Sequence, residues 1–198
     1  MRASERGFEL VDLLVATAVA AVSLLLTAPP LLRLCRSTTV ELAADEIVGA
    51  LREARAYAIR HQSNVGIKFR VEKDGGTLWA LYLDGDGDGV RTADIDRGVD
   101  PLVAPFRSLG QFGATAKLGF PPGRVPRDPG NLRKRLTNLD DPIRFNNSDI
   151  ASFSPVDGAT PGSVYVTDGI SRLLCVRIDN RSGRARILRW DRDLDRWN

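Results

Sequence analysis

Residues 13–32 have the sequence LLVATAVAAVSLLLTAPPLL, in which no side chain carries a charge. The run matches the roughly 20 apolar residues that an α-helix needs to cross the hydrocarbon core of a bilayer. Arginines lie close to it on both sides, so positive charge alone does not set its orientation. We expect a transmembrane helix at about residues 13–32.

Two carboxylates, Glu9 and Asp12, precede this run. Carboxylates at the edge of an apolar segment are costly in lipid and usually have a function there. A secretory signal peptide is the alternative interpretation of a basic start followed by an apolar stretch. The acidic positions, the length of the run and the lack of a small-residue cleavage signal before Pro29 argue against it.

The string GFELVDLL, residues 7–14, resembles the class III signal of type IV pilins and type II secretion pseudopilins. In that signal a short charged leader ends in Gly, Phe follows, and an acidic residue opens the apolar helix. The resemblance implies that residues 1–7 are a leader, that prepilin peptidase cleaves after Gly7, and that Phe8 is N-methylated. It also implies a single-pass protein of the inner membrane whose larger part lies in the periplasm.

The acidic residue of this signal is Asp12 here, whereas the family nearly always has Glu at that place. The resemblance implies that this carboxylate pairs with the N-terminal ammonium of a neighbouring subunit in an assembled filament. Aspartate keeps the charge but reaches one methylene less far, which alters the geometry of the pairing and not its sign.

Good helix formers continue after the apolar run up to about His61. A stripe of apolar side chains with alternating spacings of four and three residues is typical of one buried helix face. Only the Pro29-Pro30 pair separates this segment from the membrane run, so we expect one helix over residues 8–62. The stripe consists of Val40, Ala44, Ile47, Leu51, Ala54 and Ala58.

From Val65 onward apolar and polar side chains alternate, which is the period of a half-buried β-strand. Residues 65–69 and 78–83 flank a Lys-Asp-Gly-Gly turn and are predicted to form a hairpin. We expect a β-rich domain over residues 63–198 and therefore an α+β fold, in which the long helix packs on a largely antiparallel sheet. Further strands are predicted at residues 102–109, 117–120, 143–145, 163–167, 173–178 and 184–189.

Residues 121–142 are rich in proline and arginine and contain few apolar side chains. We expect this segment to be a surface insert in the form of a loop. The remaining pattern requires no second hydrophobic core.

Four short motifs follow one another along the chain: Arg52-Glu53-Ala54-Arg55, Trp79 before an acidic loop, Phe153-Ser154-Pro155, and Gly183-Arg184-Ala185-Arg186. Their order is similar to that of the GspH/FimT group of minor pseudopilins and pilins. The resemblance covers nearly the whole chain outside residues 121–142. It implies a type IV pilin-like fold and a structural role in a type II secretion pseudopilus or a type IV pilus, with other pilins or pseudopilins as partners.

The acidic loop after the predicted hairpin has carboxylates at alternate positions and a glycine at the sixth, like the opening of an EF-hand calcium loop. Its twelfth position is Ile95, which cannot supply the bidentate carboxylate that closes such a site. An acidic turn between two strands is the alternative interpretation. The candidate calcium ligands are Asp84, Asp86, Asp88, Asp94 and Asp96.

Residues 172–196 contain eight arginines. Because guanidinium groups bind phosphate, Arg184, Arg186 and Arg189 are candidate nucleic-acid contacts, and DNA uptake in natural transformation is the alternative function. Interleaved aspartates and a net charge of only +3, from 28 basic and 25 acidic residues, favour a solvated strand face instead.

The composition argues against an enzyme. The chain has one histidine, His61, and two cysteines, Cys35 and Cys175. A catalytic pair with serine or cysteine would have to use that histidine, and the sequence has no GxSxG motif or phosphate-binding glycine loop. We expect no cofactor other than the candidate calcium ion at the acidic loop. We expect both cysteines to be buried free thiols and not to form a disulfide.

Overall fold

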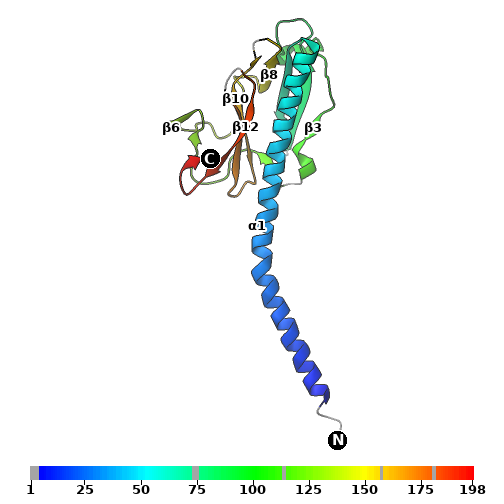
Figure 1. Cartoon of the computed structure of the whole chain (residues 1–198), viewed down its shortest axis with the longest axis vertical. Helices are drawn as coiled ribbons and strands as arrows, with labels where there is room; N and C mark the ends of the chain where they lie inside the picture. The colour runs from blue at the N-terminus through cyan, green and yellow to red at the C-terminus, as the bar shows by residue number, and fades with distance from the viewer. Residues whose placement is uncertain (1–4, 73–75, 113–114, 157, 180–181) are drawn as a thin grey trace. The chain divides into compact units, whose positions relative to one another are not determined.

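The computed structural model describes residues 5–72, 76–112, 115–156, 158–179 and 182–198. The chain divides into two compact units, Met1–Ser37 and Thr38–Asn198 (Figure 1). The predicted leader, residues 1–7, falls partly on residues 1–4, which lie outside the described residues.

The helix α1 extends from Glu5 to His61, close to the predicted bounds of 8–62. In the first unit its described apolar side chains are exposed. Residues Leu10–Thr27 have a mean hydropathy of 2.3 and are long and apolar enough, as a helix, to cross a membrane. We predicted the transmembrane helix at about residues 13–32. The window Leu10–Thr27 begins earlier and contains Asp12.

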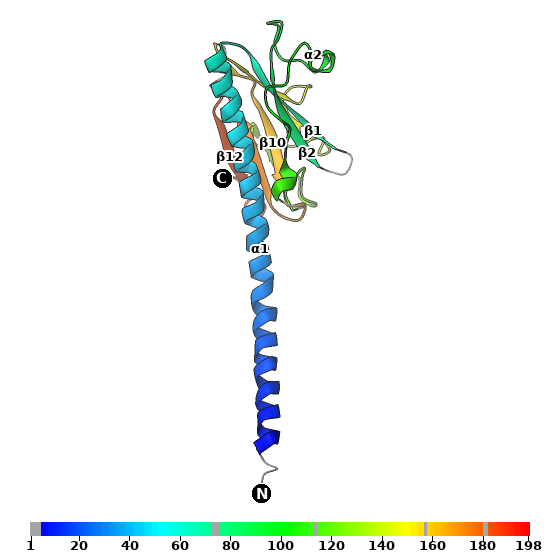
Figure 2. The ribbon, with the colours of Figure 1, turned by 90° about the vertical axis from the view of Figure 1, so that its right-hand side faces the viewer.

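In the second unit, α1 supplies one face of the main hydrophobic core. All six residues of the predicted stripe are buried, and none of them is more than 1% exposed. Figure 2 shows the helix with β1 and β2 on one side and β12 on the other. The core therefore joins the helix to two sheets, and this burial of apolar surface is the main term that stabilises the domain.

The first sheet has the strand order β3-β2-β1-β8-β9, and its pairs are antiparallel. The predicted hairpin is confirmed, with Val65 opposite Leu83 and Val71 opposite Thr77. Its inner face carries Ile67, Phe69 and Trp79 into the main core. The strands are β1 (Val65–Val71), β2 (Thr77–Leu83), β3 (Arg107–Ser108), β8 (Ile150–Ser154) and β9 (Gly158–Ala159).

The second sheet has the order β13-β12-β11-β10-β4, and a further strand, β7, also pairs with β10. Alternate residues of β10 and β11 face the main core, while Tyr165 and Cys175 face the opposite side of the sheet. The strands are β4 (Lys117–Leu118), β7 (Ile143–Arg144), β10 (Gly162–Thr167), β11 (Leu173–Ile178), β12 (Ala185–Asp191) and β13 (Arg196–Trp197).

The predicted α+β fold with a largely antiparallel sheet is confirmed, although some local expectations differ. The segment 102–109 was expected to be one strand, but its regular part is β3 and the 3₁₀ turn η1 (Leu109–Phe112). The strand β8 was not predicted, because its five residues follow a run of turn-forming Asn, Ser and Asp. The short helix α2 (Thr92–Arg97) lies within the segment after the acidic loop and was not expected either.

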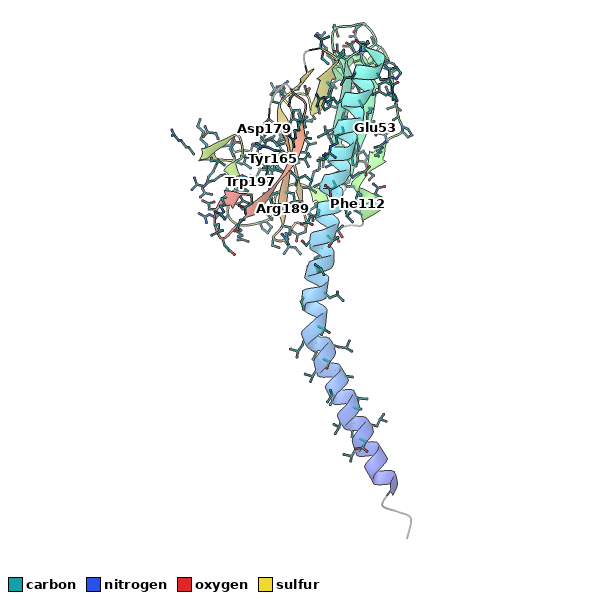
Figure 3. All side chains as sticks on the ribbon, viewed as in Figure 1. Glu53, Phe112, Tyr165, Asp179, Arg189 and Trp197 are labelled. Atoms are coloured by element: carbon teal, nitrogen blue, oxygen red, sulfur yellow. The ribbon has the colours of Figure 1, made fainter. Side chains whose placement is uncertain are left out.

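Residues 121–142 contain a hairpin that the loop prediction missed, formed by β5 (Arg127–Asp128) and β6 (Asn131–Arg135). The structure also has a second hydrophobic cluster, which our expectation of a single core did not include. In it Leu136 of the insert packs with Tyr165, Cys175 and Trp190 on the outer face of the second sheet. The partly buried Trp197 joins the cluster, and its ring centroid lies 6.2 Å from that of Tyr165 (Figure 3).

Charge reinforces this cluster. The side chain of Asp195 is 10% exposed, and its carboxylate forms ion pairs with three arginines. The distances from Asp195 Oδ2 to the guanidinium nitrogens are 2.9 Å for Arg124, 3.1 Å for Arg127 and 2.9 Å for Arg135. The hydrogen bond from Arg135 and the charges of the other two arginines hold the pKa of the Asp195 carboxyl below its usual value. The indole nitrogen of Trp197 donates to the Arg127 carbonyl at 2.7 Å. The insert is thus attached to residues 195–197 and is part of the folded domain.

Candidate functional site

The predicted processing signal lies at the start of α1. The backbone of Gly7 and Phe8 is helical, while the side chain of Phe8 lies outside the described part of the structure. The side chain of Asp12 is exposed, and it lies within the apolar window Leu10–Thr27. The described residues offer it no hydrogen bond and no ion pair. Asp12 is therefore a carboxylate without a described partner in the most apolar part of the chain.

The acidic loop is organised by two buried aspartates. One Asp84 carboxylate oxygen accepts a hydrogen bond from the Gly87 amide at 2.8 Å, and the other accepts one from the Gly89 amide at 2.9 Å. The Asn64 side chain donates a third at 2.7 Å. Partial burial raises the pKa of Asp84, but the hydrogen bonds outweigh it, so this pKa lies below its usual value. Asp100 holds the loop in the same way by accepting from two backbone amides.

Three of the five predicted calcium ligands lie together. The carboxylates of Asp84, Asp86 and Asp88 each place an oxygen within 4.8 Å of the others. Asp88 is paired with Arg91, however, and Asp94, which is buried, is paired with Arg97. Neither Asp94 nor the exposed Asp96 belongs to this group among the described residues. Both Asp84 oxygens already accept hydrogen bonds from backbone amides. The cluster therefore has few carboxylate oxygens left to bind a cation.

We therefore expect calcium to have little effect on stability. Millimolar calcium should raise the melting temperature of the detergent-solubilised full-length protein by no more than a degree or two, since a ligand at a concentration equal to its Kd adds only about 0.4 kcal/mol. Differential scanning fluorimetry with calcium and with magnesium measures this. A cation site would be established by a large rise in melting temperature with calcium but not with magnesium. The rise would have to be absent in the Asp86→Ala variant and present in the Asp96→Ala variant.

The three predicted nucleic-acid contacts do not share one set of partners. Arg186 of β12 is paired with Asp179, and Arg189 lies 3.6 Å from Glu41 of α1. Figure 3 labels Asp179, which follows the last residue of β11, and Arg189 of β12. Arg184 precedes the first residue of β12, and no hydrogen bond or ion pair of its side chain occurs within the described ranges. Of the three, Arg184 alone keeps its charge uncompensated there.

Arg184 lines a hollow with Arg52 and Arg55, which the sequence analysis named as part of a family motif but did not propose as contacts. This basic groove, about 340 Å³ in volume, lies between α1 and the start of β12. Its charged residues are Arg52, Arg55 and Arg184, and Ile59 is its largest apolar one. The sequence signal was the Arg-Glu-Ala-Arg motif on the exposed face of the helix, but the strand that meets this face could not be inferred from helical periodicity.

The remaining candidates for chemistry are isolated. The His61 ring is exposed and stacked on Tyr57 with centroids 4.0 Å apart. Cys175 is a buried free thiol, as expected, and burial raises its pKa to about 12, which keeps it protonated and unreactive. The side chain of Cys35 lies outside the described part of the chain.

Comparison with known protein families identifies a relationship. The model of a family described as type II transport protein GspH matches residues 43–183. This range includes the last third of α1, both sheets up to the start of β12, and Gly183 at the basic groove. No curated protein and no solved structure matches the chain.

Proposed function

The chain belongs to the GspH/FimT family of pseudopilins, and on this basis we propose that it is a minor pseudopilin, a structural subunit of a type II secretion pseudopilus. In this proposal α1 anchors the subunit in the inner membrane, with the domain from residue 63 onward in the periplasm. The subunit then assembles with other pseudopilins through α1. It turns over no substrate.

The exposed apolar part of α1 carries this proposal. None of the window Leu10–Thr27 is buried, although its mean hydropathy is 2.3. A continuous apolar surface of this size is unfavourable in water but stable in lipid or against other apolar helices. The same segment therefore suits both states of a pseudopilin, the membrane-embedded subunit and the assembled filament.

Asp12 supports assembly over simple anchoring. An anchor needs no carboxylate, and an ionised carboxylate in hydrocarbon is costly unless it is paired. Cleavage after Gly7 would create a new ammonium group on Phe8, four residues before Asp12 in the same helix. Pairing of Phe8 with the Asp12 of a neighbour would compensate both charges.

Processing provides a direct test. Intact-mass analysis of protein extracted from the membranes of cells with prepilin peptidase should show a chain that lacks residues 1–7 and carries one added methyl group. The Gly7→Leu variant should keep the leader, while Ser4→Ala should be processed normally. Detection of Met1 on most of the wild-type protein in these cells would contradict the proposed signal.

DNA uptake remains the second candidate function, and the uncompensated charge of Arg184 supports it. Against it, Arg186 and Arg189 already have carboxylate partners, and the net charge of the chain is only +3. Electrostatic attraction to phosphate supplies most of the affinity of non-specific DNA binding. A chain with so little excess charge should bind DNA weakly.

We expect the full-length protein in neutral detergent to show no submicromolar binding to a DNA duplex at about 0.15 M salt. Fluorescence anisotropy over a salt series measures both the affinity and its slope, which is about −0.9 per neutralised phosphate. Submicromolar binding that is lost in the Arg184→Ala, Arg186→Ala double variant, but not in an Arg70→Ala, Arg133→Ala control, would make DNA uptake the leading function.

A further inference from the structure

The basic groove brings together three arginines from two elements. Arg52 and Arg55 lie on α1, and Arg184 lies just before β12. Within the described ranges, none of the three side chains has a hydrogen bond or an ion pair. A guanidinium has five N–H donors in a planar fork, and its best partners are carboxylates and phosphates that accept two of them. The groove therefore presents strong donors that the described part of the domain leaves unused.

Other arginines of the same region do find carboxylates. Arg107 lies 2.7 Å from Glu53 on α1 and 3.8 Å from Glu46, and Arg189 lies 3.6 Å from Glu41. The carboxylates Glu41, Glu46 and Glu53 of α1 thus compensate arginines inside the domain. Arg52 and Arg55, like Arg60 outside the groove, have no ion pair within the described ranges. What distinguishes the groove is that Arg184 joins two of these unpaired arginines in one hollow.

The position of Arg55 is set by packing. Gly183 has φ +69°, and a Cβ built on it would lie 3.2 Å from the Arg55 Cδ and 3.2 Å from the Ala159 Cβ. The absence of a side chain at Gly183 lets Arg55 lie against the backbone there. The stem of the Arg55 side chain therefore lies beside Gly183 at the edge of the groove.

An apolar surface continues from the groove. A second hollow of about 350 Å³ shares Arg55 and Ile59 with the groove and adds Pro155 and Val156. Ile59 is 48% exposed and Val156 is 86% exposed. Among the described residues no aromatic side chain lines either hollow, so these residues offer no ring on which a nucleic-acid base stacks. Aliphatic surface beside guanidinium groups suits a protein segment that has both carboxylates and an apolar side chain.

We propose that the basic groove docks an acidic segment of another pseudopilin subunit, whose carboxylates bind Arg52, Arg55 and Arg184 and whose apolar side chain covers Ile59 and Val156. The inference rests on the proposed function, because that function supplies the partner subunit. In this proposal the basic groove selects which subunit lies next to this one, because an arginine pair recognises a carboxylate by both geometry and charge.

The test uses the full-length protein in a neutral detergent and two fluorescent eight-residue peptides, one of alternating Glu and Leu and one of alternating Gln and Leu. Wild-type protein should bind the acidic peptide at least tenfold more tightly than the neutral one. The Arg52→Gln, Arg55→Gln variant should lose at least tenfold of that affinity. The Arg70→Gln, Arg133→Gln variant removes two exposed arginines outside the groove and should bind like wild type. Ile59→Ser keeps the charges and should weaken both peptides.

Three results would overturn the proposal: no binding of the acidic peptide to wild type, equal losses in the groove and control variants, or tighter binding of a 20-base-pair DNA duplex that depends on the same arginines. The last result would assign the groove to nucleic acid. Thermal unfolding of each variant checks that the fold is retained. Cleavage of the leader is measured separately by intact-mass analysis of membrane-extracted protein. A negative result in the peptide-binding test therefore leaves the proposed pseudopilin function standing. A failure of cleavage, which would contradict that function, is detected without the peptides.

Discussion

Asp12→Asn is expected to leave cleavage before Phe8 intact and to reduce incorporation of the subunit into the pseudopilus by at least tenfold. The variant keeps the size and polarity of the side chain and removes its charge, so the ammonium of a neighbouring Phe8 would lie in the apolar bundle without a counter-charge. Leaving one member of a buried ion pair alone costs about 3–5 kcal/mol, and about 1.4 kcal/mol already corresponds to tenfold. Immunoblots of sheared filaments and of the membrane fraction measure the incorporated share.

The matched control is Asp12→Glu, which keeps the charge and has the longer side chain that the resembled signal usually carries. It should be processed and incorporated at least as well as wild type. Intact-mass analysis of each variant separates a processing defect from an assembly defect. Normal incorporation of Asp12→Asn would show that the carboxylate has no part in assembly.

Gly162→Ala is expected to destabilise the domain by about 3 kcal/mol, at the upper end of the cost of overpacking a core. A Cβ at this position would lie 2.1 Å from the Phe145 ring and 2.6 Å from the Arg144 carbonyl oxygen. Phe145 is fully buried and stacks on Phe69 with centroids 6.1 Å apart, so it cannot move aside without disturbing the main core. For a domain of this size the melting temperature should fall by roughly 6–12 °C.

Gly49→Ala is the matched substitution for this experiment. Gly49 lies in α1 on an exposed face, and a Cβ there meets nothing within 4 Å. Alanine should stabilise the helix by roughly 0.5–1 kcal/mol, because it restricts the unfolded chain. Tryptophan fluorescence during thermal unfolding of the full-length protein in detergent compares the two variants. Equal melting temperatures for both would mean that the strands β7 and β10 separate at little cost.

The helix and the hairpin could be predicted because their signals are local. The stripe from Val40 to Ala58 repeats at the helical period, and the residues around Val65 alternate at the period of a strand, so burial follows directly from spacing. The strand β6 has no such signal, since all five of its residues are exposed. This strand pairs with β5, and Asp195 binds arginines of the same segment that lie 60 to 71 positions before it. Such distant contacts leave no periodic trace in the sequence.

The candidate sites show the same limit. Alternate aspartates suggested ligands for a cation, but Asp84 faces the loop amides of Gly87 and Gly89, and only the folded backbone reveals this. Likewise Arg184 and Arg186 would be neighbours on one face of a continuous strand, whereas β12 begins between them, at Ala185. The pairing of Arg184 with Arg52 and Arg55 in one groove depends on tertiary packing that residue spacing cannot encode.

The attachment of residues 121–142 to Asp195 and Trp197 has a consequence for the time at which the domain becomes complete. Asp195 follows its three arginine partners by 60 to 71 positions, which a ribosome needs roughly 3–14 s to synthesise at about 5–20 residues per second. From the synthesis of Tyr165 until that of Asp195, 30 positions later, the surface around Tyr165 lacks its cover. If the subunit crosses the membrane as an extended chain, as the proposed function requires, we expect its export to depend on a factor that shields the emerging chain from aggregation until Asp195 has crossed.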